Sequence, residues 1–174
     1  MDVQFVKVTG VTPERFALWE SWLSPEKRER LARLPEKGRL LSLCGDGLAR
    51  EMLGEKLGIS PELVTFSYTE NGKPLTQGAF FSVSHSGDTV ACAVSDVPVG
   101  VDVERLRPVP PRLGAALAEY WNTQEEFWQY WTAREAAVKC HGERLWDWKK
   151  AEIFDGCITR PDLPGYAVTI CEET

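Results

Sequence analysis

VGVDVE at residues 99–104 is the stretch of this 174-residue chain that most constrains its fold. Branched apolar residues alternate there with glycine and acids, and this period of two indicates a strand that is buried on one face. We expect Val101 and Val103 to face a core, and Asp102 and Glu104 to lie together on the opposite face. Such a pair could share a hard cation, although an Asp-x-Glu on a strand is usually only a solvated polar face.

A second acidic element, WTAREAAVK at residues 131–139, is expected on a helix. Trp131, Glu135 and Lys139 recur every four residues and would share one helical face. Glu135 could complete a metal site with the Asp-x-Glu pair or act as a general base, and Lys139 could neutralise a phosphate. Carboxylate ligands favour Mg²⁺ or Mn²⁺ over zinc. The competing interpretation is a surface Glu–Lys pair beside a buried tryptophan.

The remaining strands are predicted from short runs rich in branched and aromatic residues. Runs at 80–84, 89–94 and 99–104 follow one another across short turns and suggest an antiparallel meander. Further strands are expected at 2–9 and 62–69. Two final strands are expected in the tail, where alternation resumes at Ile153, Tyr166, Val168 and Ile170.

Helices are predicted from their start and stop signals. Ser24 and Pro25 begin one helix, Gly58 ends another at 38–57, and a segment at 112–121 is helical. A long helix at 124–141 starts with a Thr123–Glu126 capping box. These elements predict an α+β protein of two similar halves, residues 1–97 and 98–174, joined near 96–98.

Composition excludes several function classes. The net charge of −6 argues against a general nucleic-acid binder. Five cysteines without a Cys-x-x-Cys favour reduced thiols in a cytoplasmic protein over a disulfide framework or a zinc site. The first residues show no signal-peptide pattern, and no apolar run is long enough to cross a membrane, so we expect no membrane association.

Three weaker signals point to anionic ligands. The segment 26–39 holds six basic and three acidic residues in an otherwise acidic chain. Lys73 lies in a Gly-Lys-Pro turn, and Ser84 and His85 lie in a Ser-His-Ser sequence at a strand end, where they could hydrogen-bond a phosphate. Each of these features alone is more often a solvated face, an ordinary turn or a satisfied polar contact.

The order of these elements is more specific than any one of them. A basic helix, Gly-Lys-Pro, Ser-His-Ser, Gly-Val-Asp-Val-Glu and Trp-x-x-x-Glu-x-x-x-Lys follow one another from residue 24 to residue 139. This series resembles the 4′-phosphopantetheinyl transferase superfamily, in particular its surfactin-synthetase-activating type. The resemblance implies two pseudo-symmetric halves, each a small antiparallel sheet packed with a long helix, and an active site in the cleft between them.

The resemblance also implies a reaction and its residues. The phosphopantetheine arm of coenzyme A would move to a serine of an apo acyl or peptidyl carrier protein in a Mg²⁺-dependent reaction, with Mn²⁺ as a possible substitute, and 3′,5′-ADP would leave. We expect a monomer. The resemblance assigns the metal to Asp102, Glu104 and Glu135; catalysis to Glu135, Lys139 and either Glu125 or Glu126; and coenzyme contacts to Lys27, Arg30, Arg39, Lys73, Ser84, His85 and Lys139. The carrier is expected to dock on residues 106–121, near Arg105, Arg107 and Arg112.

Overall fold

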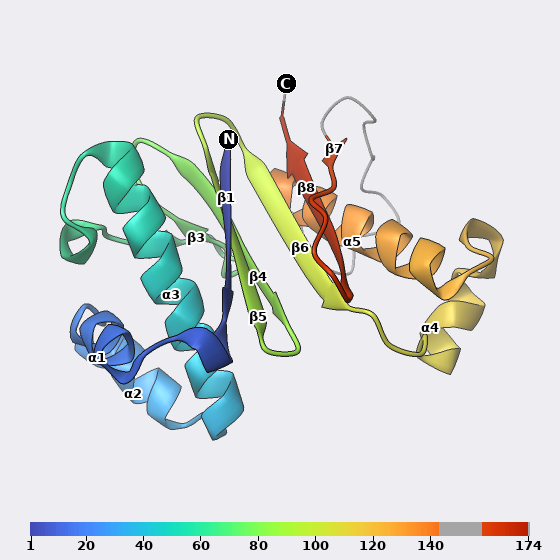
Figure 1. Cartoon of the computed structure of the whole chain (residues 1–174). Helices are drawn as coiled ribbons and strands as arrows, with labels where there is room; N and C mark the ends of the chain where they lie inside the picture. Colours follow the sequence, from blue (N-terminus) through green and yellow to red (C-terminus); the bar gives the residue numbers. More distant parts are fainter. Residues whose placement is uncertain (143–157, 174) are drawn as a thin grey trace.

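The computed structural model describes residues 1–142 and 158–173. The protein is α+β, with small antiparallel sheets and helices packed against them (Figure 1). In the described part of the chain, none of the helices has the length and apolarity needed to span a membrane.

The first sheet has the strand order β1-β5-β4, and both pairs are antiparallel. Three helices belong to this part of the molecule, and the longest of them, α3, packs against β5 (Figure 1). Short elements connect α3 to β4. The bounds are β1 (Asp2–Lys7), η1 (Val8–Gly10), α1 (Pro13–Ser21), α2 (Pro25–Ala32), α3 (Glu36–Leu57), η2 (Pro61–Leu63), β2 (Ser67–Tyr68), β3 (Pro74–Leu75), β4 (Phe80–Ser86) and β5 (Thr89–Ser95).

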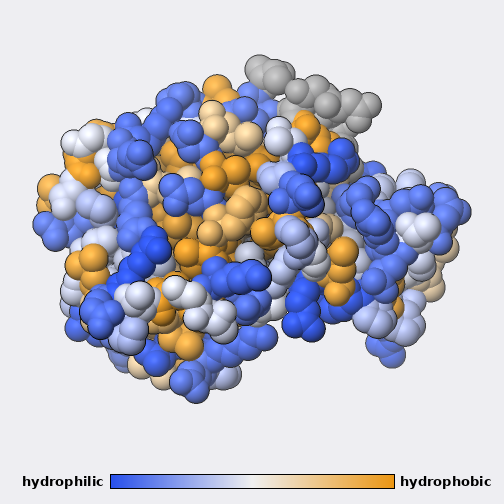
Figure 2. All heavy atoms as spheres, in the orientation of Figure 1, coloured by the Kyte–Doolittle hydropathy of each residue, from blue (hydrophilic) through white to orange (hydrophobic). Residues whose placement is uncertain are grey.

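The second sheet has the order β6-β8-β7 and is also antiparallel. The long helix α5 lies across β6 and β8, while α4 projects from the body of the molecule (Figures 1 and 2). The bounds are β6 (Val99–Arg105), α4 (Pro111–Ala116), η3 (Ala118–Tyr120), α5 (Gln124–His141), β7 (Ile158–Thr159) and β8 (Tyr166–Glu172).

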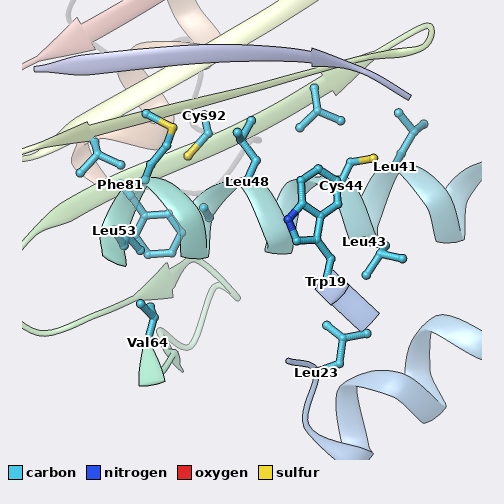
Figure 3. Close-up of a cluster of buried hydrophobic side chains, with 14 of the residues drawn as sticks. Trp19, Leu23, Leu41, Leu43, Cys44, Leu48, Leu53, Val64, Phe81 and Cys92 are labelled. Atoms are coloured by element: carbon cyan, nitrogen blue, oxygen red, sulfur yellow. The ribbon is translucent and has the colours of Figure 1, made fainter. Parts of the chain in front are cut away.

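A hydrophobic core joins α1 and α3 to the first sheet (Figure 3). Trp19 of α1 is fully buried and lies directly against Gly47 of α3, where an added Cβ would meet the indole ring at 2.2 Å. On the other side of α3, Leu48 and Leu53 pack toward the strands, where Phe81 of β4 belongs to the same cluster. In the space-filling view, apolar side chains gather over the middle of the face shown, with hydrophilic side chains around them (Figure 2).

The predicted helix signals are confirmed. Ser24 caps α2 by accepting a hydrogen bond from the backbone N–H of Lys27. The Thr123–Glu126 capping box begins α5. Gly58 and Gly142 end their helices in the left-handed conformation, with φ of 66° and 70°. These ends fix where α3 and α5 stop along the sheets.

Two expectations about the strands were wrong, and one helix was not predicted. The run at 62–69 is not a strand, because Arg50 binds the carbonyl oxygen of Val64 at 2.6 Å and only Ser67–Tyr68 pairs with another strand. The meander fails after its first hairpin, since β6 pairs with β8 rather than β5. Helix α1 was missed, although Thr12 and Pro13 form an N-cap signal that could have revealed it. The predicted tail position Ile153 lies outside the described residues.

Strands β4 and β6 lie side by side although they belong to different sheets. The backbone N–H of Val101 donates to Ser82 Oγ at 3.1 Å, and that of Val103 donates to Ser84 Oγ at 3.4 Å. The N–H of Arg105 donates to the next serine, Ser86, at 3.1 Å. The constant offset of 19 residues shows that β4 and β6 run parallel. We call this row of serine–backbone contacts the serine seam.

Candidate functional site

Carboxylate and ammonium groups meet where β4, β6 and α5 come together. Lys139 on α5 donates from Nζ to Asp102 Oδ1 at 2.7 Å, to Ser84 Oγ at 3.0 Å and to the carbonyl oxygen of Val101 at 3.2 Å. Ser84 donates its own hydroxyl proton to the same Asp102 oxygen at 2.8 Å. Asp102 and Lys139 are therefore paired, a contact that the sequence analysis did not predict.

Two oxygens at this place are buried and lack a partner. Asp102 Oδ2 and Glu135 Oε1 make no hydrogen bond among the described residues, and both side chains are 5% exposed. An unpaired buried carboxylate oxygen costs free energy, so such atoms are uncommon unless they serve a ligand. Burial, and then the nearby Asp102 carboxylate, raise the pKa of Glu135 to about 7. Burial also raises the pKa of Asp102, against the lowering effect of Lys139.

The third predicted acid, Glu104, points the same way along β6 but has other partners. Its Oε2 accepts from Ser86 Oγ at 2.6 Å and from Arg107 at 2.8 Å. Among the described residues, no three acidic, histidine or cysteine side chains enclose a common point at metal-binding distance. The unpaired oxygens of Asp102 and Glu135 nevertheless fit Mg²⁺, which is commonly held by one or two carboxylates together with phosphate oxygens.

A cavity of about 200 Å³ is lined in part by His85, whose pKa is affected by the charges of Asp102, Glu104 and Lys139. Helices α2 and α3, strand β4 and the segment around Phe66 line it. Three basic side chains predicted to contact the coenzyme face this cavity: Lys27, Arg30 and His85. The structure therefore brings together two residues of the basic helix and the histidine of the Ser-His-Ser sequence.

His85 lines the cavity and follows Ser84, which contacts Asp102, on β4. Its ring is exposed at the surface, but crowding by protein atoms, followed by the Lys139 ammonium, holds its pKa below the usual value. The imidazole is therefore neutral at neutral pH and can donate one hydrogen bond and accept another.

Sequence reasoning missed a buried ion pair in the wall of the cavity. Asp46 and Arg50, one turn apart on α3, are joined by an Nε–Oδ1 hydrogen bond of 2.7 Å. The other oxygen of Asp46 lies 3.6 Å from Lys27 Nζ, and the Arg50 guanidinium stacks on Phe66 at 4.9 Å. The pair therefore holds two lining residues of the cavity. The spacing of four was visible in the sequence, but the burial was not.

Other predicted contacts lie elsewhere. Lys73 donates to the carbonyl oxygens of Lys139 and Cys140 at 2.6 and 3.2 Å, at the end of α5. Arg39 lines a separate cavity of about 70 Å³ and lies 3.8 Å from Glu20. Ser84 contacts Asp102 and Lys139 within the group of acids, as described above.

The two glutamates at the start of α5 differ in their partners. Glu126 accepts from the backbone N–H of Asn122 and of Thr123, and therefore serves the capping box. Glu125 is exposed and accepts a hydrogen bond from Gln129. It precedes Glu135 by ten residues, which is roughly 15 Å along a helix. Glu125 therefore lies far along the helix from Glu135 and from the Asp102 carboxylate near it.

The segment proposed for carrier docking is partly occupied by internal contacts. Leu117 is buried, and Trp121 donates to the carbonyl oxygen of Gly114 at 3.2 Å. Arg107 binds Glu104 and stacks on Trp128 at 4.5 Å. Tyr120 remains exposed and stacks on Tyr130. The apolar residues here thus belong partly to a core.

The amino-acid sequence is similar to those of known proteins. Residues 11–97 match the family described as 4′-phosphopantetheinyl transferase, N-terminal. The chain is 31% identical over 147 residues to 4′-phosphopantetheinyl transferase Sfp of Bacillus subtilis (strain 168), covering 76% of this chain and 64% of that protein. It is 31% identical over 160 residues to 4′-phosphopantetheinyl transferase gsp of Aneurinibacillus migulanus, covering 84% of this chain and 68% of that protein.

A third relative is 4′-phosphopantetheinyl transferase AcpT of Salmonella typhimurium, 38% identical over 114 residues, which cover 56% of this chain and 58% of AcpT. The chain thus spans between 58% and 68% of the length of these three relatives. The family match and the coverage of the gsp relative together establish the family. This chain belongs to the 4′-phosphopantetheinyl transferase family.

Proposed function

We propose that this protein transfers the 4′-phosphopantetheine group of coenzyme A to a serine of an apo carrier protein and releases 3′,5′-ADP. The observation that carries the proposal is the pair of buried oxygens of Asp102 and Glu135 that have no partner among the described residues. These acids could hold a cation, and the basic side chains that line the cavity could hold phosphates; phosphoryl transfer needs both. The names of the relatives supply the reaction.

The proposal includes an organisation in two halves. Residues 1–97 contain the sheet that packs on α3, and residues 98–174 contain the sheet that packs on α5. The halves would be pseudo-symmetric and meet along the serine seam, with the active site between them. Because one chain would supply both halves, we propose that a monomer is active.

Phosphate groups of coenzyme A would bind to the basic side chains of the cavity. Lys27 and Arg30 supply positive charge from α2, and neutral His85 can hydrogen-bond a phosphate oxygen. Lys139, which already neutralises Asp102, lies within reach of the same region because its charge acts on His85. Neither Lys73 nor Arg39 lines this cavity, so we assign them no direct contact.

The metal would be held by Asp102 and Glu135, with Glu104 next to them on β6. Once bound, Mg²⁺ would neutralise the charge that develops on the pyrophosphate oxygens. Its absence would leave the two carboxylates close together, which agrees with the raised pKa of Glu135. These ligands are all oxygens, as a hard cation prefers.

The residues of the chain would position the reactants and move one proton. The carrier serine oxygen forms a bond to the phosphorus next to the pantetheine, and the bond from that phosphorus to the bridging oxygen breaks. The bridging oxygen leaves with the electron pair as part of 3′,5′-ADP. The serine proton passes to a carboxylate of the site, for which we propose Glu135, directly or through water. Glu125 is too far along α5 to share this role with Glu135.

The partner would be an acyl or peptidyl carrier protein, met by local contacts because the net charge of −6 gives no bulk attraction to an acidic protein. Tyr120 and Arg112 are exposed on the segment between the two acidic motifs and would contribute to this surface. The reduced thiols of the described cysteines are compatible with a cytoplasmic location, which we also propose.

Intact-mass spectrometry tests the proposal. The chain is incubated with coenzyme A, Mg²⁺ and a panel of apo carrier proteins, and each carrier is weighed. Addition of one phosphopantetheine group, lost in Asp102→Ala and in EDTA, is the expected result. Binding of coenzyme A without any carrier modification would contradict transfer and leave a binding protein. Breakdown of coenzyme A without a carrier would instead indicate a hydrolase.

A further inference from the structure

The three serines of the serine seam differ in the β6 side chain that each one faces. Each serine accepts from a backbone N–H that lies 19 positions later on β6. The side chain that each serine faces on β6 lies 18 positions later. For Ser84 that residue is Asp102, and for Ser86 it is Glu104. For Ser82 the corresponding residue is Gly100, which has no side chain.

Ser84 fixes the orientation of Asp102. Its hydroxyl donates to Oδ1 at 2.8 Å, while Lys139 binds the same oxygen at 2.7 Å. Both donors therefore engage one oxygen, and Oδ2 stays without a partner among the described residues. The amide of Val103 binds the serine oxygen and restricts the rotation of the serine itself. Ser84 is 7% exposed, so water has little access to compete for these bonds.

Ser86 fixes the orientation of Glu104 in the same way. Its hydroxyl donates to Oε2 at 2.6 Å, and the backbone N–H of Arg105 donates to the serine oxygen at 3.1 Å. A glutamate has one more rotatable bond than an aspartate, and it would otherwise extend into solvent. Arg107 provides a second donor to the same oxygen at 2.8 Å.

We propose that Ser84 and Ser86 are positioning residues for Asp102 and Glu104. Each hydroxyl takes one carboxylate oxygen and thereby aims the acid at the cation that the proposed function requires, on which this inference rests. The serines would contact neither the cation nor coenzyme A. Partners of this kind orient metal ligands, and their loss typically weakens metal binding by roughly 10- to 100-fold.

Ser82→Ala is the matched control for the substitutions of Ser84 and Ser86. Ser82→Ala removes a hydrogen bond to the β6 backbone, as Ser84→Ala and Ser86→Ala do, but it leaves both carboxylates with their partners. All three variants should therefore lose some thermal stability. Only the last two should change the geometry of the acids.

Mn²⁺ titrations followed by electron paramagnetic resonance test the proposal on the full chain, with and without coenzyme A. We expect Ser84→Ala and Ser86→Ala to weaken Mn²⁺ binding by about tenfold or more. Ser82→Ala should bind Mn²⁺ as the wild type does. In EDTA, calorimetry should give all variants the wild-type affinity for coenzyme A.

Three results would overturn the inference. If Ser82→Ala lost as much Mn²⁺ affinity as Ser84→Ala and Ser86→Ala, the effect would come from loosening the contact between β4 and β6 and not from the orientation of the acids. Weaker coenzyme A binding by Ser84→Ala in EDTA would make Ser84 a coenzyme contact. Absence of measurable Mn²⁺ binding by the wild-type protein would show that Asp102 and Glu104 form no metal site for the serines to support. If Ser84→Ala does not fold, the comparison of Ser86→Ala with Ser82→Ala decides alone.

Metal titration does not need a carrier protein. A wild-type chain that binds Mn²⁺ but modifies no carrier would therefore contradict the proposed transfer reaction. The Mn²⁺ affinities of the serine variants would still test whether Ser84 and Ser86 position the acids.

Discussion

Replacing Gly100 by alanine should separate β6 from α5 and weaken the site between them. Gly100 lies under the helix so closely that an added Cβ would be 1.9 Å from the carbonyl oxygen of Ala136 and 2.5 Å from the amide nitrogen of Cys140. Gly100 is not among the glycines with positive φ, so the backbone itself would accept alanine. The loss of stability in Gly100→Ala would therefore come from steric overlap with α5 and not from backbone strain.

The size of the effect follows from that overlap. Contacts of a Cβ below 3.0 Å are essentially never seen, so α5 would have to retreat by about 1 Å from the strand. Overpacking of a dense interior costs up to about 3 kcal/mol. For a chain of this size such a loss lowers the melting temperature by roughly 6 to 12 °C. Glu135, next to Ala136, would move with the helix.

Gly47→Ala is the matched comparison. There the new Cβ would meet the Trp19 ring at 2.2 Å, far from the acids and within the core of the first sheet. Thermal unfolding and Mn²⁺ titration are measured on both variants. Both should melt at lower temperature, and Gly100→Ala alone should also lose metal affinity. A Gly100→Ala variant that melts as the wild type does, or a Gly47→Ala variant with the same loss of metal affinity, would refute the reasoning.

Three further predictions concern other parts of the molecule. Asp46→Asn should weaken coenzyme A binding by up to about fivefold in calorimetry, because the charge that holds Lys27 is lost and a partly exposed ion pair contributes up to about 1 kcal/mol; unchanged affinity would contradict the positioning of Lys27. In EDTA, the stability of the wild type should fall as pH rises from about 4.5 to about 7, since folded Glu135 keeps its proton over a range in which the unfolded chain has lost it. Denaturant melts of Glu135→Gln should show a shallower fall, and an identical profile would count against the raised pKa. Gly38→Ala should stabilise α3 by about 1 kcal/mol in the same melts, because only Leu34 Cβ lies within 4 Å of the new methyl group, at 3.9 Å, and alanine is the better helix former; a lower stability would show that the position is tighter than the structure indicates.

The parts of the fold that could be predicted from sequence are those with local signals. Val101 and Val103 are buried and Asp102 lies opposite them because strand alternation depends only on neighbouring residues. The ends of α5 are fixed by its own capping box and glycine. Glu135 and Lys139 accordingly lie on the helix where the spacing placed them.

The expectations that failed depended on contacts between distant residues. Val64 and Phe66 belong to a coil that packs in the core with α3, because Arg50 binds the Val64 carbonyl oxygen that a strand would use. Of the three alternating residues, only Tyr68 lies on a strand, the short β2. The meander failed because serine side chains, rather than a backbone ladder, join β4 to β6. The displacement of Lys73 and Arg39 from the cavity likewise depends on tertiary partners.

The hydrogen bonds of Lys73 have a consequence for how the protein unfolds. Its ammonium binds the carbonyl oxygens of Lys139 and Cys140, and Asn71 binds that of Gly142 at 3.3 Å. The carbonyl groups of the last turn of α5, which lack partners within the helix, thus receive hydrogen bonds from the turn that joins β2 to β3. Opening of that turn would expose the helix end, so amide exchange in the last turn of α5 should report local opening near residue 73. These hydrogen bonds connect the β2–β3 hairpin to α5, the helix that packs on β6 and β8, so we expect the hairpin and the end of this helix to open together.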